Sequence, residues 1–99
     1  MRVELLSSAR PVTCDAGSPA AQALKYAYAA AFGSETALVR IGGSIPVAVD
    51  FQEAVGAPLV ISGIAQADSA PHSPNERLVV ANYHRGIEAV IRFMCRLGE

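Results

Sequence analysis

The sequence predicts an α/β fold in which a short N-terminal strand precedes a helix, strand, helix, strand, helix unit with parallel strands. Two continuous apolar runs, at 36–40 and 58–62, are typical of strands that are covered on both faces. Between them, residues 45–55 repeat apolar side chains at helical spacing. A strand–helix–strand crossover normally closes right-handed and makes its strands parallel neighbours. We therefore expect one folding unit with an N-terminal appendage.

The first third of the chain contains the appendage and the first helix. Residues 1–7 form a short β-prone run, and the proline and glycine within 8–17 indicate a connector. Ser18-Pro19 opens a helix whose apolar residues recur at helical spacing, and Gly33 is expected to end it as a left-handed cap. The many alanines of this helix predict close packing against a sheet.

A short helix between the two strands and a long final helix complete the expected fold. Gly56 is expected to terminate the helix of 45–55. The final helix is predicted over 74–97, about 36 Å at 1.5 Å per residue. Its apolar stripe comprises Leu78, Ala81, Ile87, Val90, Ile91, Met94 and Leu97. Because two strands cannot cover this stripe and their own edges, we expect the chain to associate, through domain swapping or strand-edge pairing.

The composition is that of an α/β protein without a basic surface. Hydrophobic residues make up 52% of the chain and charged residues 17%, and the net charge is -1. A nucleic-acid-binding face would require a basic excess. No apolar run approaches the roughly 20 residues of a membrane span, and no signal-peptide pattern opens the chain, so we expect a cytoplasmic location. Cys14 and Cys95 are expected to be reduced thiols.

Two loop-to-helix junctions carry most of the functional information. In the later one, His72 directly precedes Ser73-Pro74-Asn75-Glu76. The serine and glutamate can form a capping box and proline suits the first helical position, which predicts that His72 lies at the mouth of the final helix. A lone histidine there is most often a surface or capping residue. The helix dipole also disfavours imidazolium, which leaves a neutral nitrogen able to bind a metal ion.

The earlier junction is Arg40-Ile41-Gly42-Gly43-Ser44-Ile45-Pro46. As a structural feature it is a tight strand-to-helix turn, in which glycine supplies unusual dihedral angles and Ser44 caps the helix. Exposed N–H groups at a helix N-terminus also form an anion site, and both interpretations can hold together. Arg40 could bind a carboxylate through two N–H groups or form a structural ion pair.

The order and spacing of these junctions resemble the C-terminal end of the dinuclear-zinc aminoacylase and carboxypeptidase superfamily. Carnosinase-like dipeptidases, acetylornithine deacetylase and succinyl-diaminopimelate desuccinylase belong to it. In that family an R-x-G-G-[ST]-I-P turn precedes a helix and a buried strand ending in glycine, and H-[SA]-P-N-E then opens the last helix. The resemblance covers residues 18–98. Ile41 stands where many relatives carry glutamate, which leaves the substrate open.

The resemblance implies a function, a domain organisation and roles for individual residues. The chain is expected to be a C-terminal fragment of a zinc-dependent metallopeptidase or amidohydrolase that cleaves the amide bond of a dipeptide or an N-acyl amino acid. Residues 1–17 would be the end of a lid-domain strand and its connector, and 18–99 part of an α/β/α catalytic domain. His72 would be a metal ligand of a two-zinc site. The substrate's carboxylate or polar end would be bound by Arg40, Gly42, Gly43 and Ser44.

The family's H-x-D motif, paired glutamates and further carboxylate ligand are absent from the chain, so His72 is the one expected zinc ligand. Because a catalytic zinc normally takes three protein ligands and a water, we expect weak zinc binding and no activity without the N-terminal half of the catalytic domain. The alternative is a non-catalytic α/β interaction module that associates with itself or with a partner chain. Elsewhere, Asp68 is expected to be a solvated loop acid, Glu76 a capping residue and His84 an exposed side chain.

Overall fold

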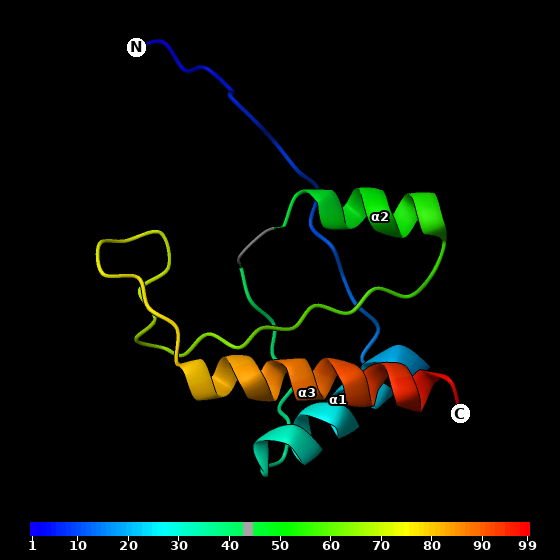
Figure 1. The fold of residues 1–99 in the computed structure, drawn as a ribbon. Coiled ribbons are helices and arrows are strands. Elements are labelled where there is room, and N and C mark those ends of the chain that lie inside the picture. Colours follow the sequence, from blue (N-terminus) through cyan, green and yellow to red (C-terminus); the bar gives the residue numbers. More distant parts are fainter. Residues whose placement is uncertain (43–44) are drawn as a thin grey trace.

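A computed structural model describes residues 1–42 and 45–99, and three helices lie within them (Figure 1). Helix α1 spans Pro19–Phe32, α2 spans Val47–Val55 and α3 spans Val80–Leu97. Helices α1 and α3 pack against each other, whereas α2 contacts neither of them in the described part of the chain. The molecule is elongated, with principal extents of 55 × 37 × 18 Å.

The predicted α/β architecture is wrong, because the described residues contain no strand. Segments 36–40 and 58–62 lack regular secondary structure, and among the described residues no backbone hydrogen bond joins them. Most of their side chains are exposed, and residues 1–7 are exposed throughout. An apolar run becomes a strand only when neighbouring strands supply hydrogen bonds and other elements cover its faces. Neither condition is met within residues 1–42 and 45–99.

Helix α1 confirms the local signals at both of its ends. Ser18 Oγ accepts a hydrogen bond from the Ala21 N–H at 3.2 Å, and Pro19 occupies the first turn, so the N-terminus is capped. Gly33 ends the helix with φ 73°, and its N–H donates to the Ala29 carbonyl at 2.9 Å. The left-handed conformation favours glycine at this position.

Small side chains form the contact between α1 and α3. Ala27 and Ala89 are fully buried, and Gly86 is buried on the same helix as Ala89. Alanine and glycine let two helix backbones approach closely, so α3 takes the place that the sequence assigned to a sheet. Among the described residues no large side chain is fully buried. The core is therefore thin, and most large apolar side chains lie outside it.

Helix α3 begins at Val80 rather than at Pro74, so the predicted capping box is absent. Val79 precedes the helix in an extended conformation without a side-chain cap. Ser73-Pro74-Asn75-Glu76 forms a turn instead, in which the Glu76 N–H donates to the Ser73 carbonyl at 3.2 Å and Asn75 has φ 61°. A type II turn prefers proline at its second position and glycine or asparagine at its third. The four residues that predicted a capping box therefore also fit a type II turn.

Helix α2 is held by the N-terminal segment. It begins at Val47, two residues after the predicted start at 45, and ends at Gly56 with φ 65°, as predicted. Arg10 forms an ion pair with Glu53, and Gln52 Nε2 donates to the Thr13 carbonyl at 3.4 Å. These contacts keep residues 8–13 along one side of the helix.

The chain that returns from α2 runs along α3, in the direction opposite to that of the helix, and contacts both α1 and α3 (Figure 1). Tyr28 of α1 donates its hydroxyl to Ser62 Oγ at 3.1 Å. Ile64 lies over Gly86 of α3, so close that a Cβ at Gly86 would meet Ile64 Cγ2 at 2.8 Å. This segment leads to the loop that precedes α3. As for membranes, each helix in residues 1–42 and 45–99 is too short or too polar to span one.

Candidate functional site

His72 lies in a loop of two consecutive turns that precedes α3 (yellow in Figure 1). The first turn, Ala70-Pro71-His72-Ser73, is closed by the Ser73 N–H, which donates to the Ala70 carbonyl at 3.2 Å. The second turn starts at the same serine. Each has proline in its second position and a positive φ in its third, 59° at His72 and 61° at Asn75. This is the pattern of two type II turns in tandem.

The backbone of His72 is in a conformation that residues with a side chain rarely adopt. Left-handed φ values cost a non-glycine residue roughly 1 kcal/mol or more, and such residues cluster at functional sites. Ala70, two positions earlier, also has a positive φ of 49°. The imidazole itself is exposed. Its loop is therefore held in an unfavourable conformation while the side chain stays accessible.

Contacts at the base of the loop maintain this conformation. The Arg77 N–H donates to the Ser69 carbonyl at 2.9 Å, and Arg77 Nη2 donates to Asp68 Oδ2 at 3.0 Å. Ser69 is buried, with 4% of its surface exposed, and its Oγ accepts the Gln66 N–H at 2.9 Å. Asp68 is exposed, as predicted, and in addition it orients the loop.

The predicted place of His72 at the mouth of a helix is wrong, because α3 begins only at Val80. The influence of a helix dipole falls off within the first turn, so it does not reach this imidazole. Glu76 likewise is no capping residue, and its N–H belongs to the second turn. What fixes His72 is the pair of turns and the closed base of the loop.

The glycine junction is described only in part. Arg40, Ile41 and Gly42 are exposed, and Arg40 takes part in no ion pair within residues 1–42 and 45–99. Gly43 and Ser44 lie outside the described residues, and so do the predicted cap and the predicted N–H groups of the anion site. Helix α2 starts after Pro46, without a side-chain cap in the described residues.

A complete zinc site is not assembled by the described residues. No three histidine, cysteine, aspartate or glutamate side chains among them could hold one metal ion. His72 is a chemically suitable ligand, but zinc takes three or four protein ligands. His84, exposed as predicted, lies on α3 with its ring against Tyr83 at 5.9 Å between ring centroids. The residues present therefore do not fit a complete site around His72.

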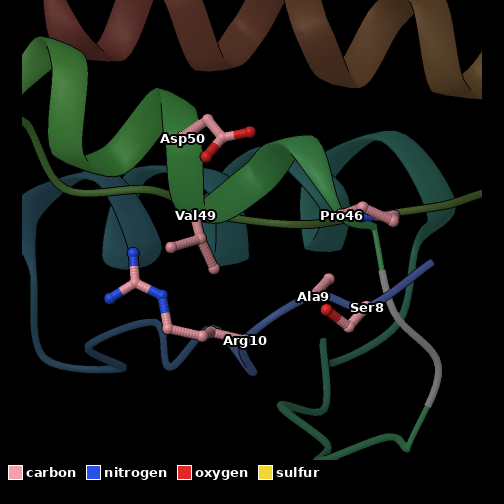
Figure 2. Close-up of a pocket in the computed structure, with 6 residues that line it drawn as sticks. All are labelled: Ser8, Ala9, Arg10, Pro46, Val49 and Asp50. Atoms are coloured by element: carbon pink, nitrogen blue, oxygen red, sulfur yellow. The ribbon is translucent and has the colours of Figure 1, made fainter. Parts of the chain in front are cut away.

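A hollow of about 530 Å³ lies between the N-terminal segment and α2 (Figure 2). Its lining consists of Ser8, Ala9, Arg10, Pro46, Val49 and Asp50. None of the predicted site residues is among them, and Arg10 is engaged by Glu53. The hollow thus lies apart from the candidate residues.

Ser69 and Arg77 were missed as residues that shape the site. Their hydrogen bond joins two backbone groups across the loop. A bond of this kind does not depend on which side chains the two residues carry, so the sequence does not indicate it. The turns themselves do have a signal, since Pro71 and Pro74 each stand second in a four-residue turn followed by a residue that can adopt positive φ. Reading both prolines as turn residues would have placed the start of α3 after Glu76.

Comparison with known proteins agrees with the junction motifs. The sequence profile of Peptidase family M20/M25/M40 matches residues 1–96. Beta-Ala-His dipeptidase of Homo sapiens is 32% identical over 77 residues, which cover 78% of this chain and 15% of the human protein. Cys-Gly metallodipeptidase DUG1 of Saccharomyces cerevisiae is 27% identical over 98 residues, which cover 99% of this chain and 20% of the yeast protein. The chain thus spans a fifth or less of the length of these relatives. No solved structure gives a significant match.

Proposed function

The chain belongs to peptidase family M20/M25/M40, and from this membership we propose that it is the C-terminal part of a zinc-dependent metallopeptidase or amidohydrolase. Its substrate would be a dipeptide or an N-acyl amino acid, whose amide bond is hydrolysed. The similar proteins support a dipeptide, because the names of two of them refer to Beta-Ala-His and Cys-Gly. Family membership favours this function over a non-catalytic interaction module.

The observation that carries the proposal is the tandem-turn loop of 69–77 with His72 in its first turn. An exposed imidazole on a strained backbone, in a loop closed at its base by Ser69 and Arg77, is a suitable metal ligand. We assign the remaining zinc ligands to the N-terminal half of the catalytic domain. Residues 1–17 would then join a lid domain to the catalytic part at 18–99.

Arg40, Gly42, Gly43 and Ser44 are proposed to bind the carboxylate or polar end of the substrate. Support comes from Arg40, which is exposed and takes part in no ion pair in the described part of the chain. A guanidinium in this state can donate two parallel hydrogen bonds to a carboxylate. A cytoplasmic location remains part of the proposal.

A chimera tests this function. In it, the 99-residue chain replaces the matching segment of the yeast Cys-Gly metallodipeptidase, and both bound zinc and hydrolysis of Cys-Gly are measured. His72→Ala should lower the zinc content and abolish turnover, whereas Gly43→Val should keep the zinc and impair substrate use. His84→Ala is the matched control and should change neither. Full zinc content and activity in the His72→Ala chimera would reject the assignment of His72.

The isolated chain provides the complementary measurement. With one ligand it should bind zinc weakly and show no amidase activity. Calorimetric titration with zinc should therefore give no tight stoichiometric endpoint. A tight endpoint that persists in the His84→Ala variant would mean that the chain contains further ligands, and the proposed division of the site between two halves would be wrong.

A further inference from the structure

Ser69 is the one buried residue in the segment of 56–79, which the structure describes throughout. Its exposed fraction is 4%, and packing of further protein on the chain would add to this burial rather than remove it. Each of its three hydrogen-bonding groups has a partner, as is usual for buried polar groups. The Oγ accepts the Gln66 N–H at 2.9 Å, the N–H donates to the Gln66 carbonyl at 3.0 Å, and the carbonyl accepts the Arg77 N–H at 2.9 Å. Ser69 thus connects the chain before the tandem-turn loop to the chain after it.

The ion pair at the base of the loop is the weaker contact. Arg77 Nη2 donates to Asp68 Oδ2 at 3.0 Å, but the two side chains are 61% and 66% exposed. An ion pair this open to water contributes little to stability. The hydrogen bond to Ser69 Oγ is partly buried, and its loss would leave the Gln66 N–H without this acceptor. The hydroxyl of Ser69 is therefore the side-chain group that holds the start of the loop in place.

The conformation of the loop depends on a fixed start and a fixed end. Three residues with a side chain have positive φ within it: Ala70 at 49°, His72 at 59° and Asn75 at 61°. Such a conformation is unfavourable and persists only where the surrounding contacts determine it. Because the backbone angles at His72 set the direction of its Cα–Cβ bond, the contacts that fix the loop also determine where the imidazole projects.

We propose that Ser69 is a positioning residue for His72. Its buried hydroxyl fixes the turn at 66–69, from which the tandem turns continue, and it thereby sets where the imidazole projects. The hydrogen bonds at the base of the loop join residues within 66–77, so the chain preorganises the imidazole by itself. A preorganised group loses less conformational freedom when it binds a ligand. That the imidazole binds a metal ion rests on the proposed function, whereas the positioning of the loop does not.

Nuclear magnetic resonance of the 99-residue chain tests the positioning directly. At positive φ the N–H and Hα protons of a residue lie close together, so His72 should give a strong cross-peak between them. Ser69→Ala should weaken this cross-peak. It should also accelerate hydrogen exchange at the Gln66 N–H about tenfold, which corresponds to the loss of one hydrogen bond. Because Ser69 lies outside the three helices, the helical circular dichroism should stay that of the parent.

Ser73→Ala is the matched control, because it removes the same hydroxyl from an exposed position in the same loop, where Ser73 Oγ donates to the Pro71 carbonyl at 3.3 Å. This variant and Asp68→Asn should both leave the His72 cross-peak strong. Ser69→Thr retains a hydroxyl and should do the same. An unchanged cross-peak in Ser69→Ala overturns the proposal. A loss of helical circular dichroism in that variant also overturns it, since Ser69 would then support the whole fold rather than the loop.

The chimera separates this proposal from the proposed function. In it, Ser69→Ala should raise the dissociation constant of zinc about tenfold in competition with a chelator, whereas Ser69→Thr should keep the parent value. Loss of zinc in His72→Ala but not in Ser69→Ala would overturn the positioning role and leave the proposed function intact. Zinc retained in His72→Ala would instead reject the proposed function, and the cross-peak in the 99-residue chain would still decide the role of Ser69. Equal losses in Ser69→Ala and Ser69→Thr would overturn the role of the hydroxyl.

Discussion

A side chain at position 86 would test how the chain that returns from α2 lies on α3. Gly86 is buried in the middle of α3, and a Cβ built there would lie 2.8 Å from Ile64 Cγ2, closer than real side chains approach. The next atoms, Ile64 Cδ1 at 3.5 Å and Ile64 Cβ at 3.8 Å, lie at ordinary contact distances. The Cγ2 methyl group of Ile64 is therefore the atom that would clash with an alanine side chain at position 86.

Two opposing effects determine the outcome of Gly86→Ala. Alanine in place of glycine inside a helix stabilises the folded state by about 1 kcal/mol, whereas forcing an extra methyl into a packed contact costs about 1–3 kcal/mol. We expect a net loss of about 1 kcal/mol in the free energy of unfolding. With Ile64→Ala, Cγ2 is gone and the nearest atom is Cβ at 3.8 Å, so Gly86→Ala should become stabilising. The coupling energy should be about 2 kcal/mol.

Urea unfolding followed by circular dichroism measures this double-mutant cycle. Ile64→Val is the matched control, because valine keeps Cγ2 and should therefore preserve the destabilising effect of Gly86→Ala. The reasoning would be refuted if Gly86→Ala stabilised the chain equally in the presence of isoleucine, valine and alanine at position 64. That result would mean that Ile64 does not lie over α3.

Two further predictions concern the ends of the helices. Val79→Asp should stabilise the chain by about 1 kcal/mol. Val79 has the extended conformation of an N-cap, but its side chain cannot accept hydrogen bonds from the first N–H groups of α3. An unchanged thermal midpoint would mean that these N–H groups already have hydrogen-bond partners. Gly33→Ala should destabilise it by about 1 kcal/mol through backbone strain alone, since no atom lies within 4 Å of the added Cβ at φ 73°. Gly33→Asn should lower the free energy of unfolding by less than Gly33→Ala, because asparagine adopts the left-handed conformation more readily. Equal losses of stability in the two variants would contradict backbone strain as the cause.

Signals that act within a few residues could be interpreted from the sequence, and those that depend on distant partners could not. Ser18, Gly33 and Gly56 act on backbone groups of their own helices, and the structure confirms all three positions. The runs at 36–40 and 58–62 have the composition of buried strands, but a strand also needs neighbours to pair with. Within the described residues these neighbours are missing, so the runs have no regular secondary structure and are mostly exposed.

The sequence indicated that His72 stands in a loop before the last helix, but it did not indicate the geometry of that loop. His72 was expected in a loop before α3 and lies in one, yet Ser73 and Glu76 were interpreted as a capping box and in fact belong to a turn. Both interpretations satisfy the hydrogen-bonding groups of the same four residues, so local chemistry does not decide between them. At the base of the loop, the hydrogen bond between the Arg77 N–H and the Ser69 carbonyl depends on how the chain folds back on itself. No pattern in the sequence indicates this bond.

The alanine and glycine contact between α1 and α3 also determines how the chain responds to temperature. Because most of the large apolar side chains are already exposed to water in the folded chain, little new apolar surface becomes hydrated when the helices separate. The heat capacity change of unfolding should then fall well below the roughly 1.2–1.5 kcal/mol/K that is usual for about 100 residues. Stability would vary little between cold and warm conditions.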